Sequence, residues 1–184
     1  YQINDEEICD YINTAKKINQ DDSVKAVSIQ HEFGIFGGEW GEYILAFLEV
    51  LEKPVTVTFH SVIPKPGRKL KKIVKEIADR VDTTIVMTES AVKILREKYH
   101  LKKTNIQIIP HGVHGVSFER SEKKKEDFGL KGKKVISSFG MISSGKGYEY
   151  VIDALPAVVK KFPNLDYIAP VGSIGVYNTV TKQV

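Results

Sequence analysis

A glycine- and serine-rich loop before a predicted helix is the stretch of this 184-residue sequence with the clearest chemical potential. Residues 135–139 form a short apolar run that predicts a buried strand and ends at Gly140, and apolar residues recur at helical spacing over residues 148–162. The loop between them contains Gly145 and Lys146. A strand, a glycine-rich turn and a helix present free backbone N–H groups to an anion, and a lysine adds positive charge. An ordinary strand-to-helix turn is the alternative interpretation, because the full dinucleotide fingerprint is absent.

Histidines follow two of the predicted strands. A strand at 55–59 is followed by His60, and a strand at 24–30 is followed by His31 and Glu32. We expect His60 to reach into a cleft, where an imidazole can donate a hydrogen bond to a hydroxyl group or to a developing negative charge. His31 and Glu32 are candidates for contact with a second substrate. A structural role is the alternative for each histidine.

Glycines follow His31 and Glu32 along the chain, and a further histidine lies at the end of another predicted strand. Gly37 and Gly38 lie in the glycine-rich stretch 34–41, where small residues let a ligand approach the backbone closely or allow a tight turn. His111 and Gly112 follow the predicted strand 106–109. The histidines share no helical face and no carboxylate cluster, so we expect no metal site.

Strands and helices alternate along the chain. The predicted strands are short and apolar rather than alternating, as in a parallel sheet that is covered on both faces, so the sequence predicts a Rossmann-like, doubly wound α/β fold. Such sheets bind ligands at the carboxyl ends of their strands. The expected strands are residues 24–30, 55–59, 84–87, 106–109, 135–139 and 165–168. Two of the expected helices span 40–51 and 70–81. A first helix is expected to be capped by Asp5, and another, which runs to about Tyr99, by Thr88 or Ser90.

A polar, lysine-rich stretch divides the sequence. We expect residues 1–114 to form part of one domain, residues 115–132 to cross over with a short helix near 122–128, and residues 133–184 to begin an incomplete second domain. The stretch 169–184 has no helical pattern, and its origin stays open.

Composition limits the function classes. Hydrophobic residues make up 42% of the sequence, yet no apolar run is long enough to span a bilayer. The single cysteine, Cys9, excludes an internal disulfide and favours the cytoplasm. The net charge of +4, with clustered lysines, indicates a solvated surface or attraction to an anionic ligand or a membrane face. Aromatic residues do not alternate with these lysines, so we expect no nucleic-acid partner.

The sequence resembles a known enzyme family over residues 24–167. The segments QHEFGIFGG, VTVTFHS, TIVMTES, IQIIPHGV and SSFGMISSGKGYEYVIDALPAVVKKFPNL occur in an order that is similar to glycosyltransferase family 4, retaining enzymes of the GT-B class with two Rossmann-like domains. The most specific part is the pairing of IPHGV with FGMISSGKG.

The resemblance implies transfer of a sugar from a nucleotide-diphosphate sugar, such as GDP-mannose or a UDP-sugar, to a hydroxyl of a saccharide, lipid-linked or other acceptor. It implies retention of the anomeric configuration and no metal or other cofactor. His60 matches the family's catalytic histidine near the donor sugar, and Lys146 matches a lysine that contacts the donor diphosphate. Gly140 and Gly145 would lie in the donor loop, whereas Gly37 and Gly38 would frame the cleft.

The sequence departs from the family pattern at two points that bear on donor binding. Met141 stands where the family often has an arginine, and the chain ends before the position of the family's paired glutamates. We therefore expect the 184-residue piece to be inactive by itself. A non-catalytic module that binds a sugar nucleotide or a protein is the main alternative. A dinucleotide-dependent oxidoreductase is less favoured without G-x-G-x-x-G.

Overall fold

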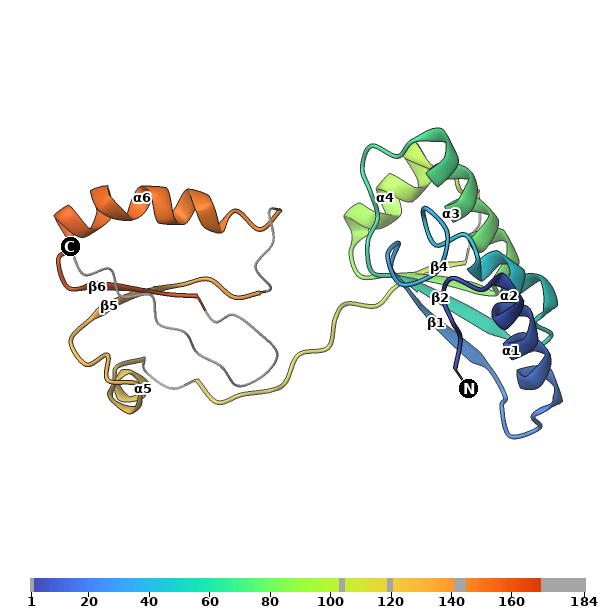
Figure 1. Cartoon of the computed structure of the whole chain (residues 1–184), viewed down its shortest axis with the longest axis horizontal. Helices are drawn as coiled ribbons and strands as arrows, with labels where there is room; N and C mark the ends of the chain where they lie inside the picture. Colours follow the sequence, from blue (N-terminus) through green and yellow to red (C-terminus); the bar gives the residue numbers. More distant parts are fainter. Residues whose placement is uncertain (1, 103–104, 119–120, 141–144, 170–184) are drawn as a thin grey trace. The chain divides into compact units, whose positions relative to one another are not determined.

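The computed structural model describes residues 2–102, 105–118, 121–140 and 145–169 (Figure 1). The chain divides into two compact units, Tyr1–Val113 and His114–Val184. Met141, where the family often has arginine, and the stretch after Ala169 fall outside the described residues.

The first unit alternates helices and parallel strands, as the sequence predicts. In chain order its elements are α1 (Ile8–Gln20), β1 (Val27–His31), α2 (Ile44–Val50), β2 (Val55–Phe59), α3 (Arg68–Arg80), β3 (Thr83–Val86), α4 (Glu89–Lys98) and β4 (Ile106–Ile108). The strands pair in the order β1-β2-β3-β4, and every pair is parallel. The expected parallel α/β sheet is therefore confirmed, and it is consistent with a Rossmann-like domain.

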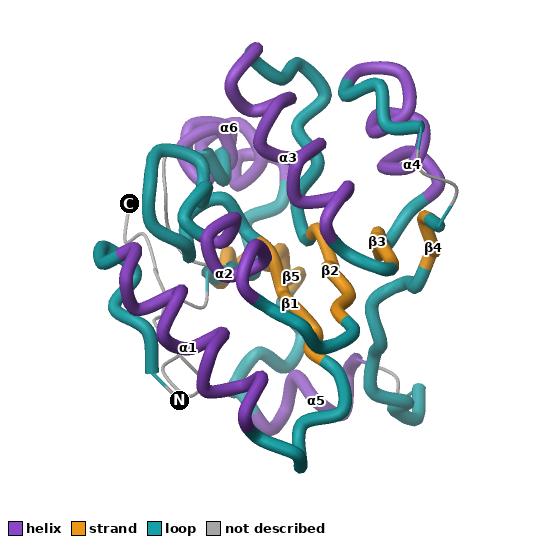
Figure 2. Tube along the Cα trace, turned by 90° about the vertical axis from the view of Figure 1, so that its right-hand side faces the viewer, coloured by secondary structure: helices purple, strands orange, loops and turns teal. Residues whose placement is uncertain are grey.

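The expected double winding is wrong for the described part of this unit. Its strand order advances in one direction without a reversal, and right-handed crossovers then place successive helices on the same face of the sheet. Helix α2 packs against both α1 and α3, and α4 packs against β3 and β4. Figure 2 shows α1, α2 and α3 lying over the strands on one side.

Alternating side chains explain this single covered face. In β2, Val55, Val57 and Phe59 are buried against the helices, whereas Thr56 and Thr58 are only half-buried. The same alternation places mostly polar side chains on the open face of neighbouring strands. The interpretation of these strands as apolar on both faces was therefore incorrect. The open face carries Ser28, Gln30, Thr56, Thr58, Thr83, Ile85 and Gln107.

The glycine-rich loop after β1 is shaped by contact with the start of the chain. Gly37 donates its N–H to the Tyr11 hydroxyl at 2.9 Å, and that hydroxyl donates to the Asp5 carbonyl at 3.2 Å. A Cβ at Gly37 would lie 1.8 Å from the Asp5 carbonyl oxygen and 2.4 Å from Tyr43 Cδ2. Gly38 has a φ of +93°, a conformation that side chains rarely adopt. Packing and backbone geometry thus account for both glycines.

Asp5 has a different role from the expected helix cap. Helix α1 begins at Ile8, and its N-cap residue, Glu7, makes no side-chain capping bond. Asp5 instead contributes its carbonyl to the Tyr11 contact that holds the N-terminal segment beside the loop.

His31 lies in the hydrophobic core, so its expected contact with a second substrate is corrected. It is the last residue of β1 and shares the helix-covered face with Ile29, which leaves its side chain 0% exposed. The rings of Phe33, Phe36 and Phe59 surround it at centroid distances of 5.3, 5.5 and 5.1 Å. Neither ring nitrogen has a hydrogen-bond partner among the described residues. Burial lowers the pKa of His31 from 6.5 to about 4.

The second unit contains a two-stranded parallel sheet, β5 (Lys134–Ser137) paired with β6 (Leu165–Ile168). Its helices are α5 (Ser121–Asp127) and α6 (Tyr148–Lys161). A small core gathers Tyr148, Tyr167 and Ala169. The strand expected at 135–139 ends earlier, and Phe139 is 95% exposed, whereas the strand at 165–168 and the short helix are confirmed.

We predict that Gly37→Ala destabilises the first unit by about 1–3 kcal/mol, because the added methyl group meets the Asp5 backbone and the Tyr43 ring. Urea unfolding followed by the fluorescence of Trp40, the single tryptophan, measures this effect. Gly34→Ala is the matched control, since a Cβ there meets no atom within 4 Å. Equal stability of the two variants would contradict the packing argument.

We also predict that the first unit loses stability as the pH falls from 6.5 to about 4. Above this window His31 is neutral in both states. Within it the unfolded chain takes up a proton that the folded chain excludes, so unfolding becomes more favourable. The difference in pKa corresponds to a loss of about 3 kcal/mol in the free energy of unfolding at the acidic end of this pH window.

Unfolding of wild type and of His31→Leu at both ends of this window tests the assignment, because leucine cannot take up the proton. The pH dependence of the free energy of unfolding should become shallower in His31→Leu. His100→Asn replaces an exposed histidine with φ of 58° by a residue that tolerates this conformation, and should leave the dependence unchanged. The same pH dependence in all three proteins would rule out His31 as its origin.

Candidate functional site

Parallel pairing brings the carboxyl ends of the four strands of the first unit to one edge of its sheet. His60 follows β2 at this edge, and its backbone N–H donates to the His31 carbonyl at 3.0 Å. His111 follows β4, and its ring centroid lies 5.5 Å from that of His60, with the ring planes at 40°. The sequence placed each histidine at a strand end but did not predict that they meet.

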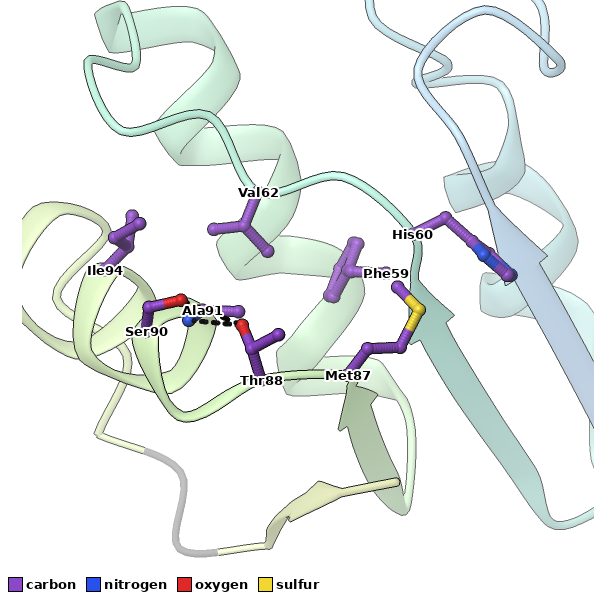
Figure 3. Close-up of a pocket in the computed structure, with 8 residues that line it drawn as sticks. All are labelled: Phe59, His60, Val62, Met87, Thr88, Ser90, Ala91 and Ile94. Carbon is purple, nitrogen blue, oxygen red and sulfur yellow. Dashed lines mark hydrogen bonds between the residues drawn. The ribbon is translucent and has the colours of Figure 1, made fainter. Parts of the chain in front are cut away.

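A pocket of about 170 Å³ opens at the ends of β2 and β3 beside the start of α4 (Figure 3). Its lining joins apolar side chains to two hydroxyls, from Thr88 and Ser90, which lie 2.9 Å apart. This volume suits a small group rather than a whole cofactor. The lining residues are Phe59, His60, Val62, Met87, Thr88, Ser90, Ala91 and Ile94.

Thr88 fixes the start of α4 next to this pocket. It is the N-cap residue of the helix, and its Oγ1 accepts a hydrogen bond from the Ala91 N–H at 3.2 Å. The predicted cap at Thr88 or Ser90 is thus resolved in favour of Thr88.

The His60 ring extends from the end of β2 toward β1 (Figure 3). Its Nε2 lies 2.8 Å from Oε1 of Gln30, a residue on the open polar face of β1. The imidazole is therefore held over the sheet edge, where its other nitrogen remains available for a ligand. Sequence reasoning missed Gln30, although the alternation of polar residues in β1 was a signal that could have found it.

Glu32 and Gly112 complete the predicted residues at this edge. Glu32 Oε1 accepts a hydrogen bond from the Ser61 hydroxyl at 3.0 Å, which links the segments that follow β1 and β2. Gly112 is exposed, and a Cβ there would meet no atom within 4 Å. The first unit thus gathers His60, His111 and Glu32 near one edge, while His31 and Gly37 serve its packing.

The other predicted residues lie between β5 and α6 in the second unit. The Gly140 carbonyl accepts a hydrogen bond from the Tyr148 hydroxyl at 2.8 Å, and Gly145 and Lys146 are exposed. Gly147 is the N-cap residue of α6, has a φ of +71° and supplies no side-chain cap. Gly147 therefore offers no side-chain acceptor to the first backbone N–H groups of α6, and N–H groups at a helix start can bind an anion.

Neither a metal-binding cluster nor a membrane-spanning helix occurs in the described ranges. In them, no group of three or more histidine, cysteine, aspartate or glutamate side chains is placed to hold a metal ion. None of the helices described is long and apolar enough to cross a membrane.

Comparison with known proteins finds a similarity within part of the chain. Residues 35–114 match the family model described as Glycosyltransferase Family 4, and no curated protein matches the chain. The matched stretch includes His60, His111 and Gly112 at the sheet edge, together with Gly37 and Gly38. The first unit is thus similar to glycosyltransferase family 4 over these residues, which supports a glycosyltransferase.

Proposed function

We propose that this chain is part of a retaining GT-B glycosyltransferase that moves a sugar from a nucleotide-diphosphate sugar to an acceptor hydroxyl. The observation that carries the proposal is the position of His60. It lies at the carboxyl end of β2, beside His111, within the stretch that matches glycosyltransferase family 4. Parallel α/β sheets bind their ligands at this edge.

The proposed chemistry divides between the two units. His60 would contact the donor sugar near the reacting carbon and orient it. Sugar transfer also requires stabilisation of the departing diphosphate, which Lys146 and the uncapped N–H groups of α6 would supply. The reaction needs no metal in this scheme.

The proposed domain roles follow the same division. Residues 1–114 would belong to the acceptor-side domain, residues 115–132 to the crossover and residues 133–184 to the donor-binding domain. His111, Gly112 and Glu32 would lie on the acceptor side of the cleft. The acceptor would be a saccharide, a lipid-linked or another hydroxyl compound, used in the cytoplasm or at its membrane face.

We predict that His60→Ala lowers kcat/KM for sugar transfer by about 10–100-fold, which corresponds to roughly 1.5–3 kcal/mol of lost transition-state stabilisation. The assay supplies the gene product that contains this sequence with a panel of nucleotide sugars and hydroxyl acceptors, and follows release of nucleoside diphosphate and formation of the glycoside.

His100→Asn is the matched control, because His100 is exposed at the end of α4 and belongs to no part of the proposed site. Wild-type kinetics in His60→Ala would reject the role of His60. Binding of nucleotide sugars without any turnover would favour the non-catalytic module instead.

We predict that Lys146→Ala lowers kcat/KM for the nucleotide sugar. The expected loss corresponds to roughly 1.5–3 kcal/mol, the range for a hydrogen bond to a charged group. Lys160→Ala removes an equally exposed lysine from the last turn of α6 and should leave the kinetics unchanged. The dependence of rate on donor concentration separates the variants. A similar loss in both would indicate a general effect of charge rather than a phosphate contact.

A further inference from the structure

The open face of the first sheet carries a short chain of hydrogen bonds that ends at His60. Gln30 Nε2 lies 3.0 Å from Ser28 Oγ and donates to it, while Gln30 Oε1 lies 2.8 Å from His60 Nε2. An amide oxygen can only accept a hydrogen bond. With the Gln30 amide in this orientation, the proton in this contact belongs to His60 Nε2.

The backbone holds the two ends of this contact in place. Strands β1 and β2 pair in parallel, with Gln30 opposite Thr58, and the N–H of His60 donates to the His31 carbonyl at 3.0 Å. Gln30 on β1 and His60, which directly follows β2, thus lie next to each other on the open face. The hydrogen bond depends only on side-chain rotation, because the sheet fixes both backbones.

Protonation at Nε2 determines what the other nitrogen of the ring can do. In a neutral imidazole with a proton on Nε2, Nδ1 carries a lone pair and accepts a hydrogen bond. Within the described ranges of the chain, His60 Nδ1 makes no hydrogen bond. The ring of His111, at a centroid distance of 5.5 Å, is the other imidazole at this edge.

We infer that Gln30 is a positioning residue that holds His60 in the Nε2–H tautomer and presents Nδ1 as a hydrogen-bond acceptor. The ligand group that meets neutral His60 is then a donor, such as a sugar hydroxyl, and not a phosphate oxygen. The assignment of that hydroxyl to a sugar rests on the proposed function. The assignment of the tautomer is independent of the proposed function.

Long-range ¹H–¹⁵N correlation spectra of the histidine-labelled chain test the inference at a pH of about 8.5, where an ordinary imidazole is neutral. In wild type, the His60 nitrogen shifts should be those of a protonated Nε2 and an unprotonated Nδ1. Gln30→Met keeps the length of the side chain but removes the acceptor, so both shifts should move toward those of a mixture of tautomers. Gln30→Glu keeps an acceptor and should preserve the wild-type tautomer.

Gln107→Met is the matched control, because Gln107 lies on the same face in β4 and donates to Asn105 rather than to His60. Its His60 shifts should equal those of wild type. An Nδ1–H tautomer in wild type, or identical shifts in wild type and Gln30→Met, would overturn the inference. Neither result depends on turnover, so a failure here and a failure of the transferase assay remain distinct.

Discussion

Parallel pairing of four consecutive strands in one direction is the constraint on which the first unit depends. It places the connecting helices on one face of the sheet, which buries Val57, Phe59 and Val86 and leaves small polar side chains on the other face. It also aligns all four carboxyl ends at one edge. The core and the candidate site are therefore two consequences of the same hydrogen-bonded ladder.

The two strand-end histidines show that the alternation of side chains decides which residue packs in the core and which lies at the candidate site. His31 points to the covered face and is enclosed by aromatic rings, where its lowered pKa makes it a source of acid sensitivity. His60 follows the next strand on the open face, where Gln30 and His111 are its neighbours. A difference of one position in the strand alternation moves an imidazole from the core to the site.

Much of the fold could be predicted from the sequence, because apolar runs and helical spacing are local signals. The strand Val55–Phe59 was predicted correctly, and Thr88 was one of the two residues predicted to cap α4. The alternation of VTVTF was also visible but was interpreted as an apolar run, so the open face and the place of His31 were predicted wrongly. The contact between Gln30 and His60 depends on the register of two strands, which no local pattern specifies. The collision that requires Gly37 involves Asp5, far away in the sequence.

The most direct test of the account is to locate the bound substrate on the sheet. Backbone amide shifts of the intact gene product, recorded by NMR during titration with the nucleotide sugar and acceptor that it uses, report which strand ends the ligands approach. The account predicts shift changes at the carboxyl edge, including His60 and His111, with little change at the opposite edge near Lys53 and Asp82. Changes concentrated at Lys53 and Asp82, with none at the carboxyl edge, would contradict it.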